Sequence, residues 1–101
     1  MYIYNVTIKV SDSIKSDWLI WLKEEHIPDV MGTSCFESSN VLRLREVDDT
    51  EGPTYIVQYT CKNKENYDRY INHFATDMRN RSYEKWGNGF IAFRTLLEQI
   101  P

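Results

Sequence analysis

The sequence has little positive charge and no long apolar run. Its 101 residues contain 12 lysines and arginines against 15 acidic residues, which gives a net charge of −3. Nucleic-acid-binding domains usually carry a basic excess or a basic stripe, so we expect no nucleic-acid partner. No apolar run approaches the length that crosses a bilayer, so we expect no membrane association.

Cysteine is also scarce, and the N-terminus shows no targeting pattern. The residues after Met1 enter a strand-like alternation at once, without the charged start and apolar centre of a signal peptide. We therefore expect a cytoplasmic protein. Cys35 and Cys61 lack C-x-x-C spacing, so we expect both to be reduced and to act as small buried hydrophobes. No linker or low-complexity tract interrupts the chain, which predicts one domain over residues 1–101.

The sequence does contain a regular succession of strand and helix patterns. Alternation predicts strands over residues 2–10, about 35–47, 54–61 and 90–97. Apolar stripes of helical period predict one helix from Ile14 that ends or bends at Pro28, and a second that runs from about Tyr67 to Gly87. The order β-α-β-β-α-β with right-handed crossovers predicts a ferredoxin-like α+β fold: a four-stranded antiparallel sheet with two helices on one face.

Hydrophobicity also predicts which strand residues face the helices. That set is Tyr4, Val6, Ile8, Leu42, Leu44, Tyr55, Val57, Tyr59, Ile91, Phe93 and Leu97. The opposite face would then carry Ile3, Asn5, Thr7, Val41, Arg43, Arg45, Ile56, Gln58, Thr60, Phe90, Ala92, Arg94 and Leu96. This second set is too apolar for a solvated face and too polar for a core. It indicates a second copy packed over the sheet around a lined cavity, or else a dry dimer interface or a plain amphipathic sheet.

Five residues are the candidates for chemistry or binding. His26 at a helix end could transfer a proton, or it could instead cap the last helical carbonyls. Arg43 and Arg94 could bind a carboxylate or phosphate, or form ion pairs with acidic residues of a partner subunit. Asn5 and Gln58 could orient a ligand or satisfy each other.

Particular stretches of the chain resemble a known family. The segment Trp18–Met31, with His26 and Pro28 near its end, is similar to the first-helix signature of the dimeric α/β-barrel superfamily. Nearly the whole chain resembles the bacterial family called domain of unknown function 4286, and the matching stretches are Tyr4–Thr7, Trp18–Met31, Cys35-Phe36, Leu42–Leu44, Tyr55–Tyr59 and Phe93–Glu98. The resemblance implies a dimeric α/β-barrel fold and a homodimer, but no activity. The superfamily includes cofactor-free monooxygenases, haem-handling enzymes, small aldehyde- or lactone-processing enzymes and stress-response proteins.

The leading hypothesis is a homodimer, paired through the open sheet face, that binds a small polar or anionic molecule between sheet and helix end. The ligand-binding residues would be Asn5, Arg43, Gln58 and Arg94, with His26 handling a proton if there is turnover. The alternatives are a non-catalytic dimerisation or partner-binding module, and a cofactor-free oxygenase or isomerase that uses His26. His26 and His73 lie on different predicted helices, so we expect no metal and no cofactor.

Overall fold

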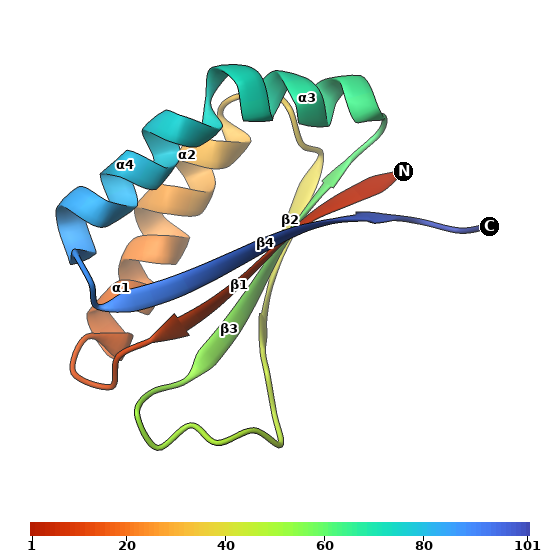
Figure 1. The fold of residues 1–101 in the computed structure, drawn as a ribbon. Helices are drawn as coiled ribbons and strands as arrows, with labels where there is room; N and C mark the ends of the chain where they lie inside the picture. The colour runs from red at the N-terminus through yellow and green to blue at the C-terminus, as the bar shows by residue number, and fades with distance from the viewer.

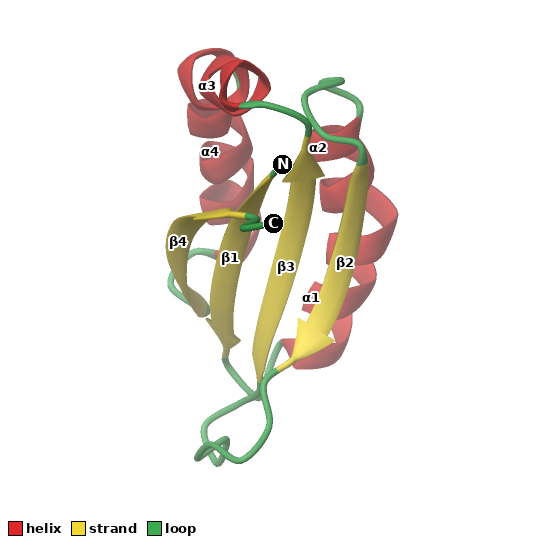
Figure 2. Cartoon of the chain, turned by 90° about the vertical axis from the view of Figure 1, so that its right-hand side faces the viewer, coloured by secondary structure: helices red, strands yellow, loops and turns green.

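A computed structural model describes residues 1–101. Its elements are β1 (Tyr2–Val10), α1 (Lys15–Trp21), the π-helical turn η1 (Leu22–His26), α2 (Ile27–Met31), β2 (Ser38–Arg43), β3 (Thr54–Cys61), α3 (Lys64–His73), α4 (Ala75–Trp86) and β4 (Phe90–Glu98). The strands form one antiparallel sheet in the order β2-β3-β1-β4. The helices all lie on one face of it (Figure 1), and Figure 2 looks onto the other, uncovered face. The predicted ferredoxin-like α+β fold is confirmed.

The first helical segment runs further than predicted. Pro28 lies at the start of α2, directly after the π-helical turn, and it does not end the helical segment. The segment therefore continues to Met31, and the Gly32 N–H closes it on the Pro28 carbonyl at 2.8 Å. Between α1 and α2 the chain widens into the π-helical turn, and such single turns are frequently found at functional sites.

The second helical segment is broken in the middle. Phe74 leaves helical geometry, with φ −127° and ψ −31°, and this divides the predicted long helix into α3 and α4. Asn63 caps α3, because its side chain accepts a hydrogen bond from the Asn66 N–H at 2.9 Å. The break lets α3 and α4 run in different directions over the sheet (Figure 1). No helix of the chain has the length and apolarity needed to span a membrane.

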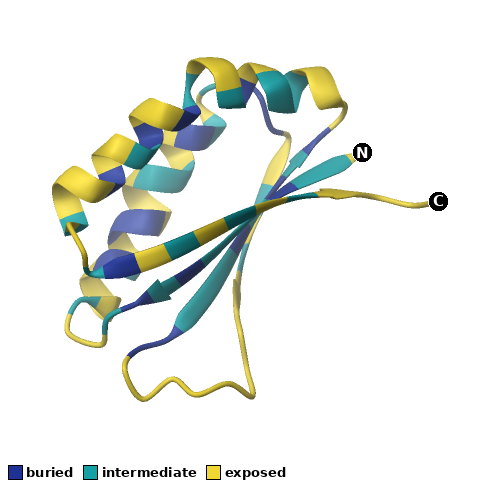
Figure 3. Cartoon of the chain, in the orientation of Figure 1, coloured by how far each residue is buried: buried dark blue, intermediate teal, exposed yellow.

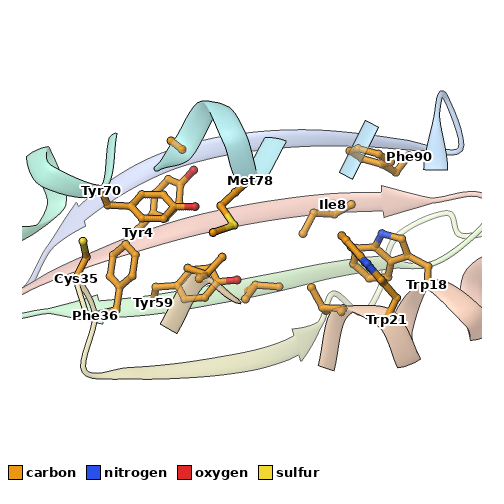
Figure 4. Close-up of a cluster of buried hydrophobic side chains, with 14 of the residues drawn as sticks. Tyr4, Ile8, Trp18, Trp21, Cys35, Phe36, Tyr59, Tyr70, Met78 and Phe90 are labelled. Carbon is orange, nitrogen blue, oxygen red and sulfur yellow. The ribbon is translucent and has the colours of Figure 1, made fainter. Parts of the chain in front are cut away.

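Aromatic side chains fill the space between sheet and helices. Tyr4 lies at the centre of one cluster, with ring centroids 5.5 Å from Tyr70, 6.0 Å from Phe36 and 6.1 Å from Tyr59. A second cluster at the other end contains Trp18, whose ring stacks on Tyr55 with centroids 5.7 Å apart. Figure 4 shows the tyrosine cluster and the tryptophan cluster at opposite ends of the core, with Met78 between them.

Two strands present the faces opposite to those predicted. On β4, Ile91, Phe93 and Leu97 are exposed, whereas Phe90 is buried and Arg94 is half-buried. Exposed and less exposed residues alternate along this strand (Figure 3). Arg94 pairs with Val6, so it faces the helices. The predicted assignment for β4 was therefore wrong, and hydrophobicity failed because apolar residues lie on both faces of this strand.

The same inversion occurs on β2. Val41 pairs with Val57 and lies on the helix side, while Leu42 pairs with Ile56 on the open face and is exposed. The regular strand also ends at Arg43 rather than continuing to Val47. For β1 and β3 the predicted faces are correct, because Tyr4, Ile8, Val57 and Tyr59 are all buried.

Candidate functional site

A cavity lies between the helix-facing side of the sheet and the helices. The cavity is small, and the volume available to the centre of a water molecule inside it is about 50 Å³. Its walls are mostly apolar and aromatic, and its lining residues are Tyr4, Val6, Ile8, Trp18, Trp21, Leu22, His26, Val30, Val57, Tyr59, Tyr70, Met78, Arg79, Ser82, Phe90, Ala92 and Arg94. A concave apolar space with a few convergent polar groups is the usual form of a small-molecule site.

Two arginines give this cavity its charge. Arg79 comes from α4 and Arg94 from β4, and the chain's ion pairs include neither of them. Arg79 donates a hydrogen bond from Nη2 to the Tyr4 hydroxyl at 3.4 Å, while its buried Nε–H has no acceptor. Burial raises the pKa of Tyr70, and the positive charges of Arg79 and Arg94 both act to lower it. Both guanidinium groups therefore lie near the Tyr70 phenol. The tyrosine end of the cavity is therefore the cationic end.

His26 reaches the cavity from the last residue of the π-helical turn. Its imidazole stacks on the Trp21 indole, with ring centroids 4.8 Å apart. The pKa of His26 is lowered to about 4, mainly by burial; Asp29 opposes this shift, and the charges of Arg94 and Arg81 add to it. Because that pKa lies well below neutrality, His26 is uncharged at pH 7. The imidazole can accept or donate one hydrogen bond without adding charge to the cavity.

The opposite end of the cavity is apolar. Trp18 and Leu22 are buried there, and Phe90 contributes from the start of β4. Trp21 meets Trp86 edge-on, with centroids 5.8 Å apart, and this contact joins α1 to the end of α4. Figure 4 shows Trp18, Trp21, Ile8 and Phe90 grouped at this end. The cavity is thus amphipathic along its length.

A shallow depression on the outside of the helices lies next to the cavity. It is lined by Trp21, Glu25, His26, Asp29, Arg81, Glu84 and Lys85, so Trp21 and His26 border both spaces. Above them Arg81 of α4 forms an ion pair with Asp29 of α2 at 3.3 Å. The wall between cavity and exterior is therefore thin at His26.

The structure brings together only two of the five predicted site residues. His26 and Arg94 both line the cavity. Asn5 and Gln58 lie on the uncovered sheet face, where the Gln58 Nε2 donates to the Asn5 Oδ1 at 3.2 Å. Arg43 lies at the end of β2 and forms an ion pair with Asp49 of its own chain at 2.8 Å.

Sequence reasoning did not identify the remaining polar groups of the cavity. Arg79 and Tyr70 are not among the site residues predicted from the sequence, and Tyr4 is predicted only to face the helices. A usable signal was present, because Arg79 follows the buried Met78 and precedes the buried Ser82 by three residues on α4. An arginine next to the apolar stripe of a helix, opposite tyrosines on a strand, indicates a lined cavity rather than a dry core.

The uncovered sheet face carries exposed apolar residues at both of its edges. Phe93 is 66% exposed and Ile91 is 59% exposed on β4, where Leu97 is also exposed, and Leu42 is exposed on β2 at the opposite edge. A polar row crosses the middle of this face, in which Asn5 is bonded to Gln58 and donates to the Thr95 hydroxyl at 3.3 Å. Large apolar side chains exposed on one face often mark an interaction surface.

A protein-family model matches residues 1–100, and its description is "Domain of unknown function (DUF4286)". The chain belongs to this family. The resemblance found in the sequence is thereby confirmed, and the family description itself gives no activity. No curated protein matches the chain significantly.

Solved structures share the fold of this DUF4286 chain at low sequence identity. One is an ethyl tert-butyl ether (ethd) family protein from Bacillus halodurans, with 11% identity, TM-score 0.70, and 99% of this chain and 100% of that chain covered. Another is SnoaB, a cofactor-independent oxygenase from Streptomyces nogalater, with 9% identity, TM-score 0.68 and coverages of 97% and 92%. A third is described as a dimeric ferredoxin-like protein from an uncultured marine organism, with 11% identity, TM-score 0.67 and coverages of 99% and 97%.

Proposed function

We propose that residues 1–101 form one domain of a cytoplasmic homodimer that binds a small anionic molecule in the cavity between sheet and helices. The observation that carries the proposal is the pair of arginines, Arg79 and Arg94, which enter a mostly apolar cavity without a carboxylate partner. Removing a charge from water is costly unless an opposite charge or several hydrogen bonds compensate for it. A bound anion supplies that compensation, and the Arg79 Nε–H that lacks an acceptor is one donor ready for it.

The position of the cavity supports a ligand site rather than a structural void. It lies where helix, π-helical turn and sheet meet, and His26, stacked on Trp21, adds a neutral hydrogen-bonding group to its lining. Asn5, Gln58 and Arg43 have partners within the chain and lie outside this space, so the proposed site uses His26, Arg79, Arg94 and Tyr4 instead.

The homodimer rests on the uncovered sheet face. Phe93, Ile91 and Leu97 expose apolar surface there, and a second copy would remove it from water. Two structures of the same fold are described as dimeric ferredoxin-like proteins, from an uncultured marine organism and from Jannaschia. Because a two-fold interface places the same patch on both subunits, the self-complementary mixture of apolar surface and the Asn5–Gln58 row suits this arrangement.

The binding proposal is tested by titrating the protein with a panel of small carboxylates and phosphates and measuring thermal stabilisation and heat of binding. Arg94→Gln removes one cationic group from the cavity and should weaken any bound anion about tenfold or more. Arg43→Gln is the matched control, since it removes an arginine that lies outside the cavity. Equal binding by both variants, or no binding of any anion by the wild type, would overturn the proposal.

The placement of His26 favours a second candidate, a cofactor-free oxygenase or isomerase. A neutral imidazole bordering the cavity could remove a proton from a bound substrate. SnoaB, which shares the fold, is a cofactor-independent oxygenase. This candidate requires that an anion bound by the wild type be converted, and that His26→Gln abolish conversion while retaining binding. Binding of an anion without its conversion would overturn this second candidate and leave only the binding function.

A further inference from the structure

The cavity differs sharply between its two ends. At one end Arg79 donates to the Tyr4 hydroxyl, and the charges of Arg79 and Arg94 both act on Tyr70. At the other end Trp18, Trp21 and Phe90 offer aromatic surface (Figure 4). A ligand that fills the cavity must therefore be charged at one end and apolar at the other.

The apolar end sets a chemical limit on the ligand. Trp18, Leu22 and Phe90 are buried there and present carbon surface. His26, stacked on Trp21, offers one hydrogen-bonding group near this end, so a body with several hydroxyl groups would lose most of its hydrogen bonds to water without replacement. Sugar phosphates and polyhydroxylated acids are therefore poor matches, whereas a hydrocarbon body is a good one.

The size of the cavity sets a second limit. The volume available to the centre of a water molecule is about 50 Å³, whereas pockets that hold drug-sized ligands measure roughly 300–1,000 Å³. The ligand is therefore small, built on no more than a single ring or a short branched chain. Polycyclic substrates exceed this space.

The charged end favours a carboxylate over a phosphate dianion. A planar carboxylate accepts paired hydrogen bonds from a guanidinium group, and its hydrocarbon body can extend directly from it into the apolar end. Inorganic phosphate would satisfy the arginines but leave the aromatic end unfilled. Its second charge would also raise the cost of leaving water.

We infer that this site takes a small monocarboxylate with a compact apolar body, bound by Arg79, Arg94 and the Tyr4 hydroxyl, with its body against Trp18 and Trp21. The inference rests on the proposed function and narrows its ligand to one chemical class. Benzoate and isovalerate are suitable probes, because each joins one carboxylate to a ring or a branched chain.

The test compares these probes with three ligands that lack one or both of these features, using isothermal titration calorimetry and tryptophan fluorescence on the wild-type protein. Acetate lacks the apolar body, benzyl alcohol lacks the charge, and inorganic phosphate lacks both the body and the planar head. We expect benzoate or isovalerate to bind about tenfold tighter than any of the three, and to change the tryptophan emission. Arg94→Gln should reduce the affinity advantage of benzoate over benzyl alcohol, and Arg43→Gln should preserve that advantage.

The outcomes separate this inference from the function on which it rests. If phosphate or acetate binds as tightly as benzoate, the cavity still binds anions, but the assignment to apolar monocarboxylates is overturned. If benzyl alcohol binds as tightly as benzoate, both are overturned, because the arginines then contribute nothing. If no ligand binds, the proposed function fails as a whole. The ligand series needs no variant, so it remains decisive even if Arg94→Gln does not fold.

Discussion

The imidazole of His26 stacks on the indole of Trp21, with 4.8 Å between ring centroids and 24° between ring planes. Both rings border the cavity on one side and the outer depression on the other. This pair therefore forms part of the wall between the cavity and the outer depression. The accessibility of His26 at this wall can be measured separately from ligand affinity.

The ion pair between Arg81 and Asp29 spans the two helical segments above His26. Both side chains are about half exposed, so Asp29→Asn should lower the free energy of unfolding by less than about 1 kcal/mol. It should nevertheless make His26 more accessible. The measurement is the rate at which diethyl pyrocarbonate modifies His26, followed by mass spectrometry, with the exposed His73 as internal reference.

Asp68→Asn is the control for that experiment, because it removes the Lys64–Asp68 ion pair of similar exposure on α3. It should leave the ratio of His26 to His73 modification unchanged. An unchanged ratio in Asp29→Asn as well would show that the ion pair has no part in closing the wall.

Stability should depend on pH through His26. Its pKa is lowered to about 4 in the folded chain, against about 6.5 when unfolded. Between these values the unfolded state binds more protons, so the free energy of unfolding falls as the pH falls from about 6.5 to about 4. The expected loss is on the order of 2–3 kcal/mol, measured by urea denaturation at fixed protein concentration.

His26→Gln should remove most of this pH dependence, because glutamine does not titrate. His73→Gln should retain it, since His73 is exposed on α3. A wild-type protein equally stable at pH 4.5 and pH 7 would contradict the buried, neutral state of His26.

Charge introduced on the uncovered sheet face should separate the subunits. Phe93 is 66% exposed in the single chain, and its burial between two copies would contribute about 1.5–3 kcal/mol per subunit. Phe93→Arg replaces this contribution with an unpaired buried charge. Light scattering after size exclusion should show the mass fall from twice the chain mass of 12.1 kDa to that mass itself.

Ile20→Arg is a matched control for the dimer, because Ile20 is 55% exposed but lies on α1, away from the sheet face. It should leave the mass unchanged. A single-chain mass for the wild type at micromolar concentration would refute the homodimer.

Gly52 holds the turn before β3 against the end of β1. Its φ is +144°, and an added Cβ would overlap the Val10 carbonyl oxygen. Gly52→Ala should therefore lower the free energy of unfolding by about 2–4 kcal/mol, measured by chemical denaturation. Gly32→Ala, at an ordinary helical φ of −63°, should cost less than about 1 kcal/mol. Similar losses in the two variants would contradict this explanation.

The fold could be predicted from the sequence because its elements are strongly patterned. The alternation of β1 and β3 places Tyr4 and Val57 in the core as expected. The faces of β4 could not be predicted by the same rule. Arg94 is tolerated among helix-facing residues because it lines a cavity, and Phe93 lies exposed on a sheet face that no element of this chain covers. Hydrophobicity alone cannot distinguish a lined cavity from solvent, or an interface from a core.

The candidate site could be predicted only in part for the same reason. His26 and Arg94 stand out as residue types, and both line the cavity. Arg79 does not stand out in the sequence, because its position at the cavity depends on the rotation of α4 after the break at Phe74. Arg43 looked equivalent to Arg94 in the sequence, yet it meets Asp49 across the loop between β2 and β3. The two arginines differ in which side chains lie near them in the folded chain, and their spacing in the sequence does not show this.

The π-helical turn from Leu22 to His26 makes the site tolerant of a change in chain length at one point. A π-helical turn accommodates one residue more than the α-helical turn it interrupts. Deleting a single residue among Lys23, Glu24 and Glu25 would let the segment relax to a regular α-helix, and the side chains after the turn would keep their direction relative to α1, because the wider turn already absorbs the extra residue. His26 would then stay beside the cavity. A homologue that lacks one residue here would keep both the fold and the imidazole in its site.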